Sequence, residues 1–137
     1  MTDMPFLGPA LRRLLEEYPS LHNGLSRTEE QLLHAGATGA RHRLEFYAES
    51  QRDEDCPWGD WSIFWRLDRL ATGPEPALRR VAADAFALTD DGQRLLAREK
   101  DWLERPGGID AWIGGVQVQG PEGAWRWSET DRTLVSR

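Results

Sequence analysis

Few residues of this chain are of the types that carry out catalysis or bind a metal ion. The three histidines are His22, His34 and His42, and the one cysteine is Cys56. No two of the histidines have the i, i+4 spacing of a helical metal site. Cys56 follows the acidic run 53–55, which disfavours its thiolate form and makes it a poor nucleophile. The sequence therefore predicts no catalytic residue, no metal-ligating residue, and a chain that is not an enzyme.

The acidic and glycine-rich segments of the sequence do not have the patterns of cofactor-binding sites. The acids at 53–55 lack the alternating ligands and the central glycine of a calcium loop. The glycine pairs at 107–108 and 114–115 do not follow a strand and open a helix, as phosphate-binding loops do. We expect no cofactor and no small-molecule substrate.

Seven tryptophans are the most unusual feature of the composition. Each can bury about 150–250 Å², and we expect most of them to fill the core of a small domain. Trp65 points partly outward on its predicted helix, whose aliphatic residues face the core. One of Trp125 and Trp127, which share a strand face, is expected on the open side of a small sheet. Trp65, Trp125 and Trp127 are therefore the candidate residues of a protein interface.

Four arginines would contact DNA if the chain were a DNA-binding winged helix. Arg66 and Arg69 lie on the helix that would enter the major groove, and Arg79 and Arg80 lie on the wing. The alternative is a solvated surface on which the helical pair is neutralised by Asp68 and nearby carboxylates. Neighbouring strand residues point to opposite faces, so Arg79 and Arg80 serve one surface only if a bulge intervenes.

The charge of the chain does not favour a nucleic-acid partner. Its 137 residues include 17 basic and 23 acidic residues, a net charge of −6. Residues 1–50, 51–100 and 101–137 each carry two more acidic than basic residues, so no segment concentrates positive charge.

No apolar run approaches the roughly 20 residues of a membrane span, and we expect no secretory signal. The sequence predicts a cytoplasmic protein with no membrane partner.

Helices dominate the first half of the predicted fold. Leucines at three- and four-residue spacing predict a first helix over 5–18, which could pack as an arm on a partner. The segment 26–29 has the form of a capping box that begins a second helix. A third helix is predicted over 39–51, with Leu44 facing inward, and a fourth follows the cap residue Asp60.

After these helices the spacing of apolar residues changes. The stretches 77–82 and 85–88 predict a short β-hairpin. Thr89 then caps a longer helix whose buried stripe is expected to continue to Leu103. Alternation over 116–135 predicts a small antiparallel β-meander.

The order of three helices, a hairpin and a helix is that of a winged helix-turn-helix domain. We therefore predict an α+β fold: a winged-helix-like helical core with a β-hairpin wing, an N-terminal helix and a small C-terminal antiparallel β-meander. A single domain over 1–137 would comprise a helical arm at 1–25, the winged-helix-like core at 26–104 and the meander extension at 105–137.

Several stretches of the sequence together resemble one bacterial protein family. In order, they read PFLGPALRRLLEEYPSLHNGLSRTEEQLL, WGDWSIFWRLDRLA, ALTDDGQRLLA and GIDAWIGGVQV followed by WRW. They are similar to the C-terminal region of the proteins grouped as domain of unknown function 1835, and they cover most of this chain. The resemblance implies a winged-helix-like fold that follows an N-terminal α/β domain in the family, and it implies no catalytic residue.

These features together predict a non-catalytic, winged-helix-like interaction module that acts through protein–protein contacts. It would either self-associate or dock to a partner. The alternative is a DNA-binding transcriptional regulator of the winged helix-turn-helix type, a hypothesis that rests on analogy of fold.

Overall fold

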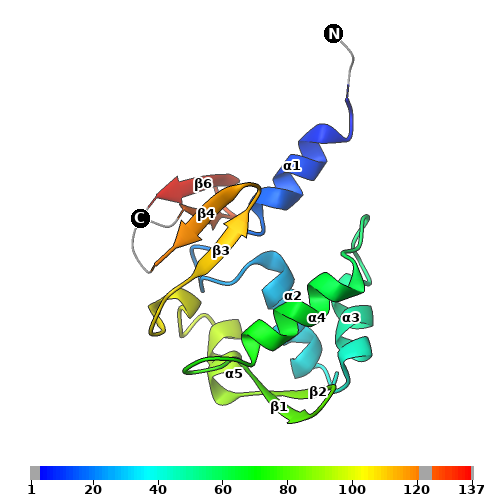
Figure 1. Ribbon diagram of the computed structural model, residues 1–137. Helices are drawn as coiled ribbons and strands as arrows, with labels where there is room; N and C mark the ends of the chain where they lie inside the picture. The colour runs from blue at the N-terminus through cyan, green and yellow to red at the C-terminus, as the bar shows by residue number, and fades with distance from the viewer. Residues whose placement is uncertain (1–3, 121–124, 137) are drawn as a thin grey trace. The chain divides into compact units, whose positions relative to one another are not determined.

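Five α-helices and three antiparallel strand pairs form the part of the chain that the computed structural model describes, residues 4–120 and 125–136 (Figure 1). The predicted α+β class is confirmed. Among these residues, no helix has both the length and the apolar content needed to cross a membrane. The elements are α1 (Leu7–Leu15), α2 (Arg27–Ala37), α3 (Arg43–Gln51), α4 (Asp60–Leu70), β1 (Leu78–Ala82), β2 (Ala85–Leu88), α5 (Asp90–Leu96), the 3-10 helix η1 (Trp102–Glu104), β3 (Asp110–Ile113), β4 (Val116–Gln119), β5 (Trp125–Ser128) and β6 (Thr133–Ser136).

The described residues divide into two units, each with its own packing. The central unit is continuous, Thr28–Lys100, and holds nearly all of α2, with α3–α5 and the β1–β2 hairpin. The terminal unit combines described residues of 1–27 and 101–137, and holds α1, η1 and β3–β6. The sequence predicts divisions after residues 25 and 104, but it does not predict that the two ends of the chain form one unit. That the whole chain acts as a single domain stays a prediction.

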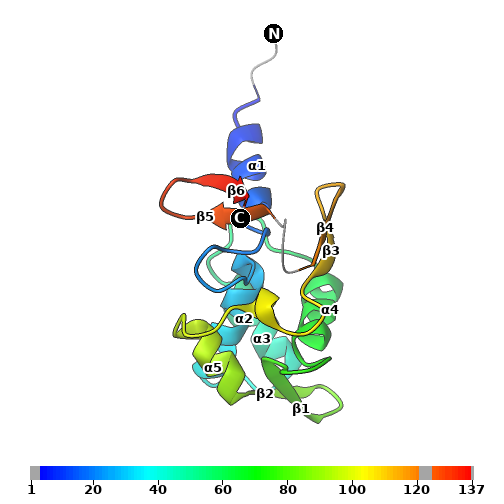
Figure 2. The same cartoon turned by 90° about the vertical axis from the view of Figure 1, so that its left-hand side faces the viewer.

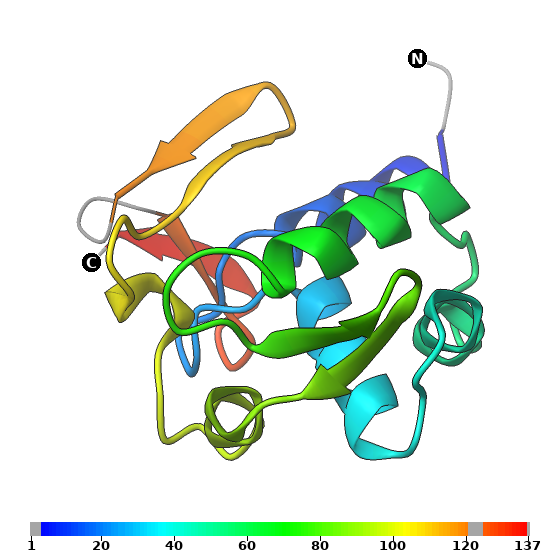
Figure 3. The ribbon, with the colours of Figure 1, turned by 60° about the horizontal axis from the view of Figure 1, so that its bottom comes forward.

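The core of the central unit is aliphatic and aromatic. Phe46 of α3 packs edge to face on Phe86 of β2, with ring centroids 6.1 Å apart. Seen from the hairpin side, β1 and β2 lie between α5 and α3, with α4 alongside (Figure 3). The large apolar side chains that this unit buries completely include Leu32, Leu33, Phe46, Ile63, Leu67, Leu70, Leu78 and Leu95.

α3 begins at Arg43, later than the sequence predicts, because His42 caps it. The His42 Nδ1 accepts a hydrogen bond from the Leu44 N–H (3.3 Å), and the Glu45 carboxylate accepts one from the His42 N–H (2.9 Å). This reciprocal pair is a capping box that uses histidine, which is not among the preferred cap residues. The inward face of the helix is centred on Phe46 and Leu44 is exposed, so the predicted inward position of Leu44 is wrong.

The predicted hairpin is confirmed. β1 and β2 pair antiparallel, with Leu78 opposite Leu88 at one end and Ala82 opposite Ala85 at the other. The register shifts between Arg80 and Ala82, which marks a bulge in β1. An isolated hairpin of two short strands is only marginally stable in water, so this hairpin depends for its stability on the helices that pack beside it.

Thr89 holds the turn from β2 into α5, which confirms the predicted cap. Its Oγ1 accepts a hydrogen bond from the Gly92 N–H (3.0 Å) and donates one to the carbonyl of Pro76 (2.7 Å). Its own N–H donates to the carbonyl of Ala77 (3.1 Å). Gly92 lies so close to Ala77 that a Cβ on it would be 2.3 Å from the Ala77 carbonyl oxygen. The start of α5 is thus held against the segment that precedes β1.

α5 is shorter than the sequence predicts. It ends at Leu96, and Arg98 adopts a positive φ of 61°. The Glu99 N–H then donates to the carbonyl of Arg94 (2.9 Å), as in a Schellman motif. Glycine is the usual residue at such an end, and here an arginine takes its place. The stripe that was expected to continue to Leu103 is therefore broken, and Leu103 lies in η1 of the terminal unit.

The terminal unit has a core of its own. Its strands form two antiparallel pairs, β3–β4 and β5–β6, which confirm the predicted C-terminal antiparallel region (Figure 2). Leu14 and Leu15 of α1 pack against the buried cluster. The buried apolar residues come from η1, from three strands and from the segment after α1: Tyr18, Leu103, Ile113, Val118 and Trp127.

A buried ion pair joins three segments of the terminal unit. The two terminal nitrogens of Arg126 lie 2.6 Å and 3.2 Å from the two carboxylate oxygens of Asp101. Arg126 also donates to the carbonyl of Ser20 (3.3 Å), and Asp101 accepts a hydrogen bond from the Leu103 N–H (2.9 Å). A bidentate pair of this kind is directional, so it fixes β5 against the loop after α1 and the start of η1.

Candidate interaction surface

The outward face of α4 carries two exposed tryptophans one turn apart. Ile63 and Leu67 are fully buried, and helical geometry turns Trp61 and Trp65 to the opposite side. Their exposed fractions are 81% and 52%. We call this pair the α4 ridge. Trp65 is exposed as the sequence predicts. Trp61 was not among the candidates, although its spacing of four residues from Trp65 is visible in the sequence.

Two arginines lie over the ring of Trp65. The guanidinium of Arg69 is 4.8 Å from its centroid and that of Arg66 is 5.9 Å away. Arg66 also lies 5.3 Å from the ring of Trp58, and the Trp58 carbonyl accepts a hydrogen bond from Tyr47 Oη (3.1 Å). Guanidinium groups at these distances are attracted to the face of an indole ring. The contacts therefore restrict the rotamers of Trp65 while leaving half of it exposed.

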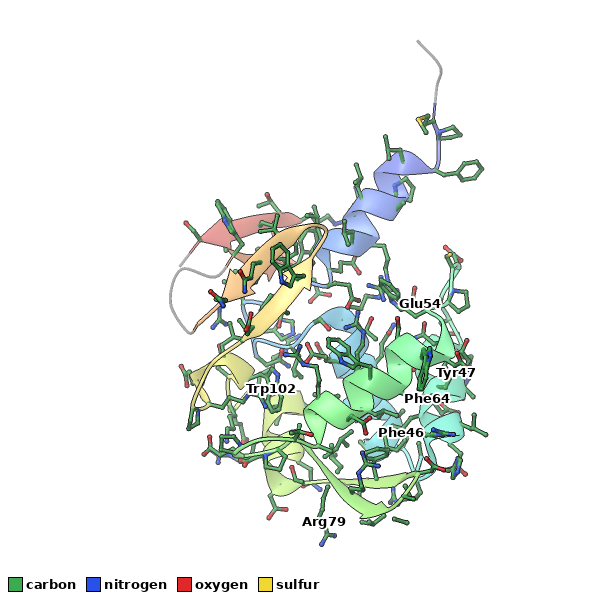
Figure 4. All side chains as sticks on the ribbon, in the orientation of Figure 1. Phe46, Tyr47, Glu54, Phe64, Arg79 and Trp102 are labelled. Carbon is green, nitrogen blue, oxygen red and sulfur yellow. The ribbon has the colours of Figure 1, made fainter. Side chains whose placement is uncertain are left out.

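Aromatic contacts also join α4 to α3. The rings of Phe64 and Tyr47 meet edge to face, with centroids 6.5 Å apart (Figure 4). The guanidinium of Arg43 lies 4.6 Å from the Phe64 centroid and pairs with Asp84 in the hairpin turn (3.3 Å). These contacts fix α4 in the central unit, so the α4 ridge is carried by a rigid helix.

Arg80, a candidate DNA contact, is held by residues of its own unit. Its guanidinium forms an ion pair with Asp68 of α4 and donates to the carbonyl of Ala83 at 2.6 Å. It also lies 4.9 Å from the ring of Phe86. The solvated-surface interpretation of the sequence expects Asp68 to pair with Arg66 and Arg69 of its own helix. In the structure, Asp68 forms an ion pair with Arg80 of the hairpin. Arg80 thus links β1 to α4.

Arg79 is exposed and points away from the hairpin (Figure 4). The bulge in β1 follows Arg80, so it does not bring Arg79 and Arg80 to one surface. Arg66 and Arg69 lie over tryptophan rings on another element. Within the described residues, the four candidate DNA contacts do not form one open basic face.

The two tryptophans of β5 differ sharply in exposure. Trp125 has an exposed fraction of 48%, whereas Trp127 is 7% exposed and belongs to the core of the terminal unit. The backbone of Trp127 donates to the carbonyl of Pro19 (2.8 Å) and accepts from the Leu21 N–H (3.0 Å). The candidate interface residue Trp127 is therefore corrected to a core residue, because its side chain packs in the buried cluster with Tyr18, Leu103, Ile113 and Val118. Trp112 of β3 is exposed and was not among the candidates.

Two of the histidines have local roles at helix ends, and the cysteine lies in a loop. His42 caps α3, and His34 lies in the last turn of α2 with its Nε2 3.9 Å from a Glu30 oxygen. Cys56 is exposed in the loop before α4. Over 4–120 and 125–136, no group of three or more His, Cys, Asp or Glu side chains could hold a metal ion.

No protein-family model, curated protein or solved structure matches this chain.

Proposed function

We propose that this chain is a non-catalytic, cytoplasmic interaction module that binds a protein partner, or a second copy of itself, through the α4 ridge. The observation that carries the proposal is the exposure of Trp61 and Trp65 on a helix whose opposite face is fully buried. Tryptophan and arginine are among the residues most enriched where binding energy concentrates in protein interfaces. Both types occur here, since Arg66 and Arg69 lie over the Trp65 ring.

The energetics of the ridge favour contact with another apolar surface. Burial of a fully exposed indole side chain removes about 150–250 Å² from water, which at about 25 cal/mol per Å² is about 4–6 kcal/mol before the costs of association. Trp61 is close to this case, and Trp65, which is 52% exposed, would contribute about half as much. Trp65 is already restricted by its guanidinium contacts, so less rotamer entropy is lost when it is covered. Two such side chains supply enough to offset part of the association cost.

A DNA-binding regulator of the winged helix-turn-helix type has less support. The helix that would enter the major groove presents Trp61 and Trp65 outward. The wing residue Arg80 is engaged with Asp68 of that same helix. The chain also carries a net charge of −6, which opposes long-range attraction to a phosphate backbone.

The test compares Trp61→Ala and Trp65→Ala with Trp112→Ala, which removes an exposed tryptophan from β3 in the terminal unit. Sedimentation velocity at increasing protein concentration measures self-association, and affinity capture from the native host measures retained partners. We expect each ridge variant to weaken the complex by about tenfold or more, and Trp112→Ala to leave it unchanged. Thermal unfolding should be nearly the same for all three, because each side chain is exposed.

A chain that stays monomeric and retains no protein would overturn the proposal, as would a complex that Trp112→Ala weakens equally. Binding of mixed-sequence DNA with a steep salt dependence, abolished by Arg66→Glu, would instead favour the transcriptional regulator.

A further inference from the structure

The α4 ridge offers only a small apolar area. Trp61 and Trp65 have exposed fractions of 81% and 52%, so at about 250 Å² for a whole indole side chain they present roughly 330 Å² together. Each partner in a standard protein–protein interface contributes about 800 Å². Within the central unit, all of which the structure describes, the other exposed large apolar side chains are Leu44 on α3 and Val81 on β1. The area of the ridge therefore matches a short segment of a partner better than a second folded copy.

The small area also favours a segment that is ordered before it binds. Fixing the backbone of a flexible peptide costs entropy at every residue, and the area of two indoles offsets that cost for only a few residues. A short helical segment is marginal in water and would have to be ordered on binding. A proline-rich segment already holds the extended polyproline II conformation, so it loses less entropy on the ridge.

The hydrogen-bonding groups of the ridge match such a segment. Within the part of the chain that the structure describes, the indole N–H groups of Trp61 and Trp65 donate to no other residue. A polyproline II backbone has no internal hydrogen bonds, so its carbonyl groups remain able to accept from these donors. Surfaces lined by aromatic side chains are a recurrent binding site for proline-rich segments. The ridge thus presents both the apolar and the polar groups that a proline-rich segment needs.

The charges around the ridge do not select a charged partner. Asp60 and Asp68 are exposed on α4. The guanidinium groups of Arg66 and Arg69 lie 5.9 Å and 4.8 Å from the centroid of Trp65. Because both signs of charge lie close to the ridge, binding of an uncharged segment should depend little on salt, unlike binding of a phosphate backbone.

We propose that the α4 ridge binds a proline-rich segment of a partner protein in the polyproline II conformation. This inference rests on the proposed function of the ridge and names the class of its partner. Proline rings would pack against the exposed parts of Trp61 and Trp65, and backbone carbonyl groups would accept from the two indole N–H groups. About six prolines span about 19 Å, which covers the 11 residues and about 16 Å of α4.

The probe is a fluorescently labelled synthetic peptide of about ten prolines. A twin peptide has glycine at every second position, which keeps its length and removes most of the preformed conformation. Fluorescence anisotropy measures the affinity of the full chain for both peptides. We expect the proline peptide to bind at least tenfold more tightly than its twin. Its affinity should change less than about twofold between about 50 and 200 mM salt.

Variants of the ridge test the contacts. Trp61→Ala and Trp65→Ala should each weaken binding of the proline peptide about tenfold or more. Trp61→Phe keeps an apolar ring and removes the indole N–H donor, so it should weaken binding by about threefold. Trp112→Ala removes an exposed tryptophan of the terminal unit and should leave binding unchanged.

The outcomes separate this inference from the proposed function. Failure of the proline peptide to bind, equal binding of both peptides, or an equal loss with Trp112→Ala would overturn the inference. If a dimer or a captured complex nevertheless depends on Trp61 and Trp65, the proposed function stands and the class of partner is wrong. If neither the peptide nor any complex depends on them, both are wrong.

Discussion

The central and terminal units differ in how far apart in the sequence their contacting residues lie. The central unit is one continuous stretch, and its packing residues come from consecutive elements of that stretch. Its core consists of leucine, isoleucine and phenylalanine, with Phe46 against Phe86 as its aromatic contact. The side chains of His42 and Thr89 cap their helices by accepting from backbone N–H groups two and three residues away, and Thr89 also donates to the carbonyl groups of Pro76 and Ala77.

The terminal unit depends on residues that are distant in sequence. Its backbone hydrogen bonds join Pro19 and Leu21 to Trp127, and its buried ion pair joins Asp101 to Arg126. Gly24 packs at the same place, with a φ of +74° and no room for a Cβ, which would lie 2.5 Å from an Asp101 oxygen. The terminal unit thus adds a buried polar network between distant segments to its apolar core, whereas the completely buried large side chains of the central unit are mainly apolar.

The largest effect is expected from removing the charge that Asp101 pairs with. Arg126→Ala leaves the Asp101 carboxylate, whose side chain is only 12% exposed, without its cation, which should cost the terminal unit about 3–5 kcal/mol. Urea unfolding followed by tryptophan fluorescence measures this. Adding Asp101→Asn should recover part of the loss, and Arg12→Ala at an exposed site should change stability by less than about 0.5 kcal/mol. A loss below about 1 kcal/mol for Arg126→Ala would contradict the polar organisation of this unit.

The next effect concerns packing in the central unit. Gly92→Ala places a methyl group 2.3 Å from the Ala77 carbonyl oxygen and 2.6 Å from a Leu88 methyl, so the backbone must shift. We expect a loss of about 1–3 kcal/mol in the free energy of unfolding of this unit, by urea titration. Gly59→Ala, where no atom lies within 4 Å, is the control for the steric clash; because Gly59 is the N-cap of α4, it should cost less than about 1 kcal/mol. Equal stability of the two variants would show that α5 is not tightly packed against Ala77 and Leu88.

A smaller effect is expected at the cap of α5. Thr89→Ala removes the acceptor of the Gly92 N–H and should destabilise the central unit by about 1 kcal/mol. Thr89→Ser keeps the hydroxyl and should retain most of that stability. Thermal unfolding by circular dichroism measures both, and a Ser variant as unstable as the Ala variant would show that the methyl group, not the cap, is responsible.

The smallest effect concerns acid stability at the cap of α3. Hydrogen bonds from the backbone N–H groups of His42 and Arg41 lower the pKa of Glu45 below its ordinary value of 4.5. Folding therefore favours the charged form, so this stabilisation is complete above that value and is lost as the pH falls through the lowered pKa. The stability difference between the native chain and Glu45→Gln should be constant near neutral pH and shrink below about pH 4.5. If the stability difference between the two chains instead grew as the pH falls, the lowered pKa of Glu45 in the folded chain would be contradicted.

Local signals predicted those features whose partners are close in the chain. Thr89 and Gly92 are three residues apart, and the hairpin strands are joined by a two-residue turn, so both were predictable. The end of α5 was not, because Arg98 adopts a conformation that normally signals glycine. Within the candidate site, the phase of α4 predicted the exposure of Trp65. The resemblance to the domain of unknown function 1835 family stays a prediction.

By itself, the sequence determined the fold class, the hairpin and the outward face of α4, because these depend on periodicity and on caps between near neighbours. Only the tertiary structure decided which tryptophan of β5 is buried, that Asp101 pairs with Arg126, and that half of the leucines of α1 stay exposed. Trp125 and Trp127 have the same strand phase, and they differ in what packs on them, since Trp127 joins the buried cluster of Tyr18, Leu103 and Ile113. Periodicity indicates which face of a helix or strand is apolar. Which other segment covers that face depends on contacts between residues that can be more than a hundred positions apart in the sequence, as Tyr18 and Trp127 are.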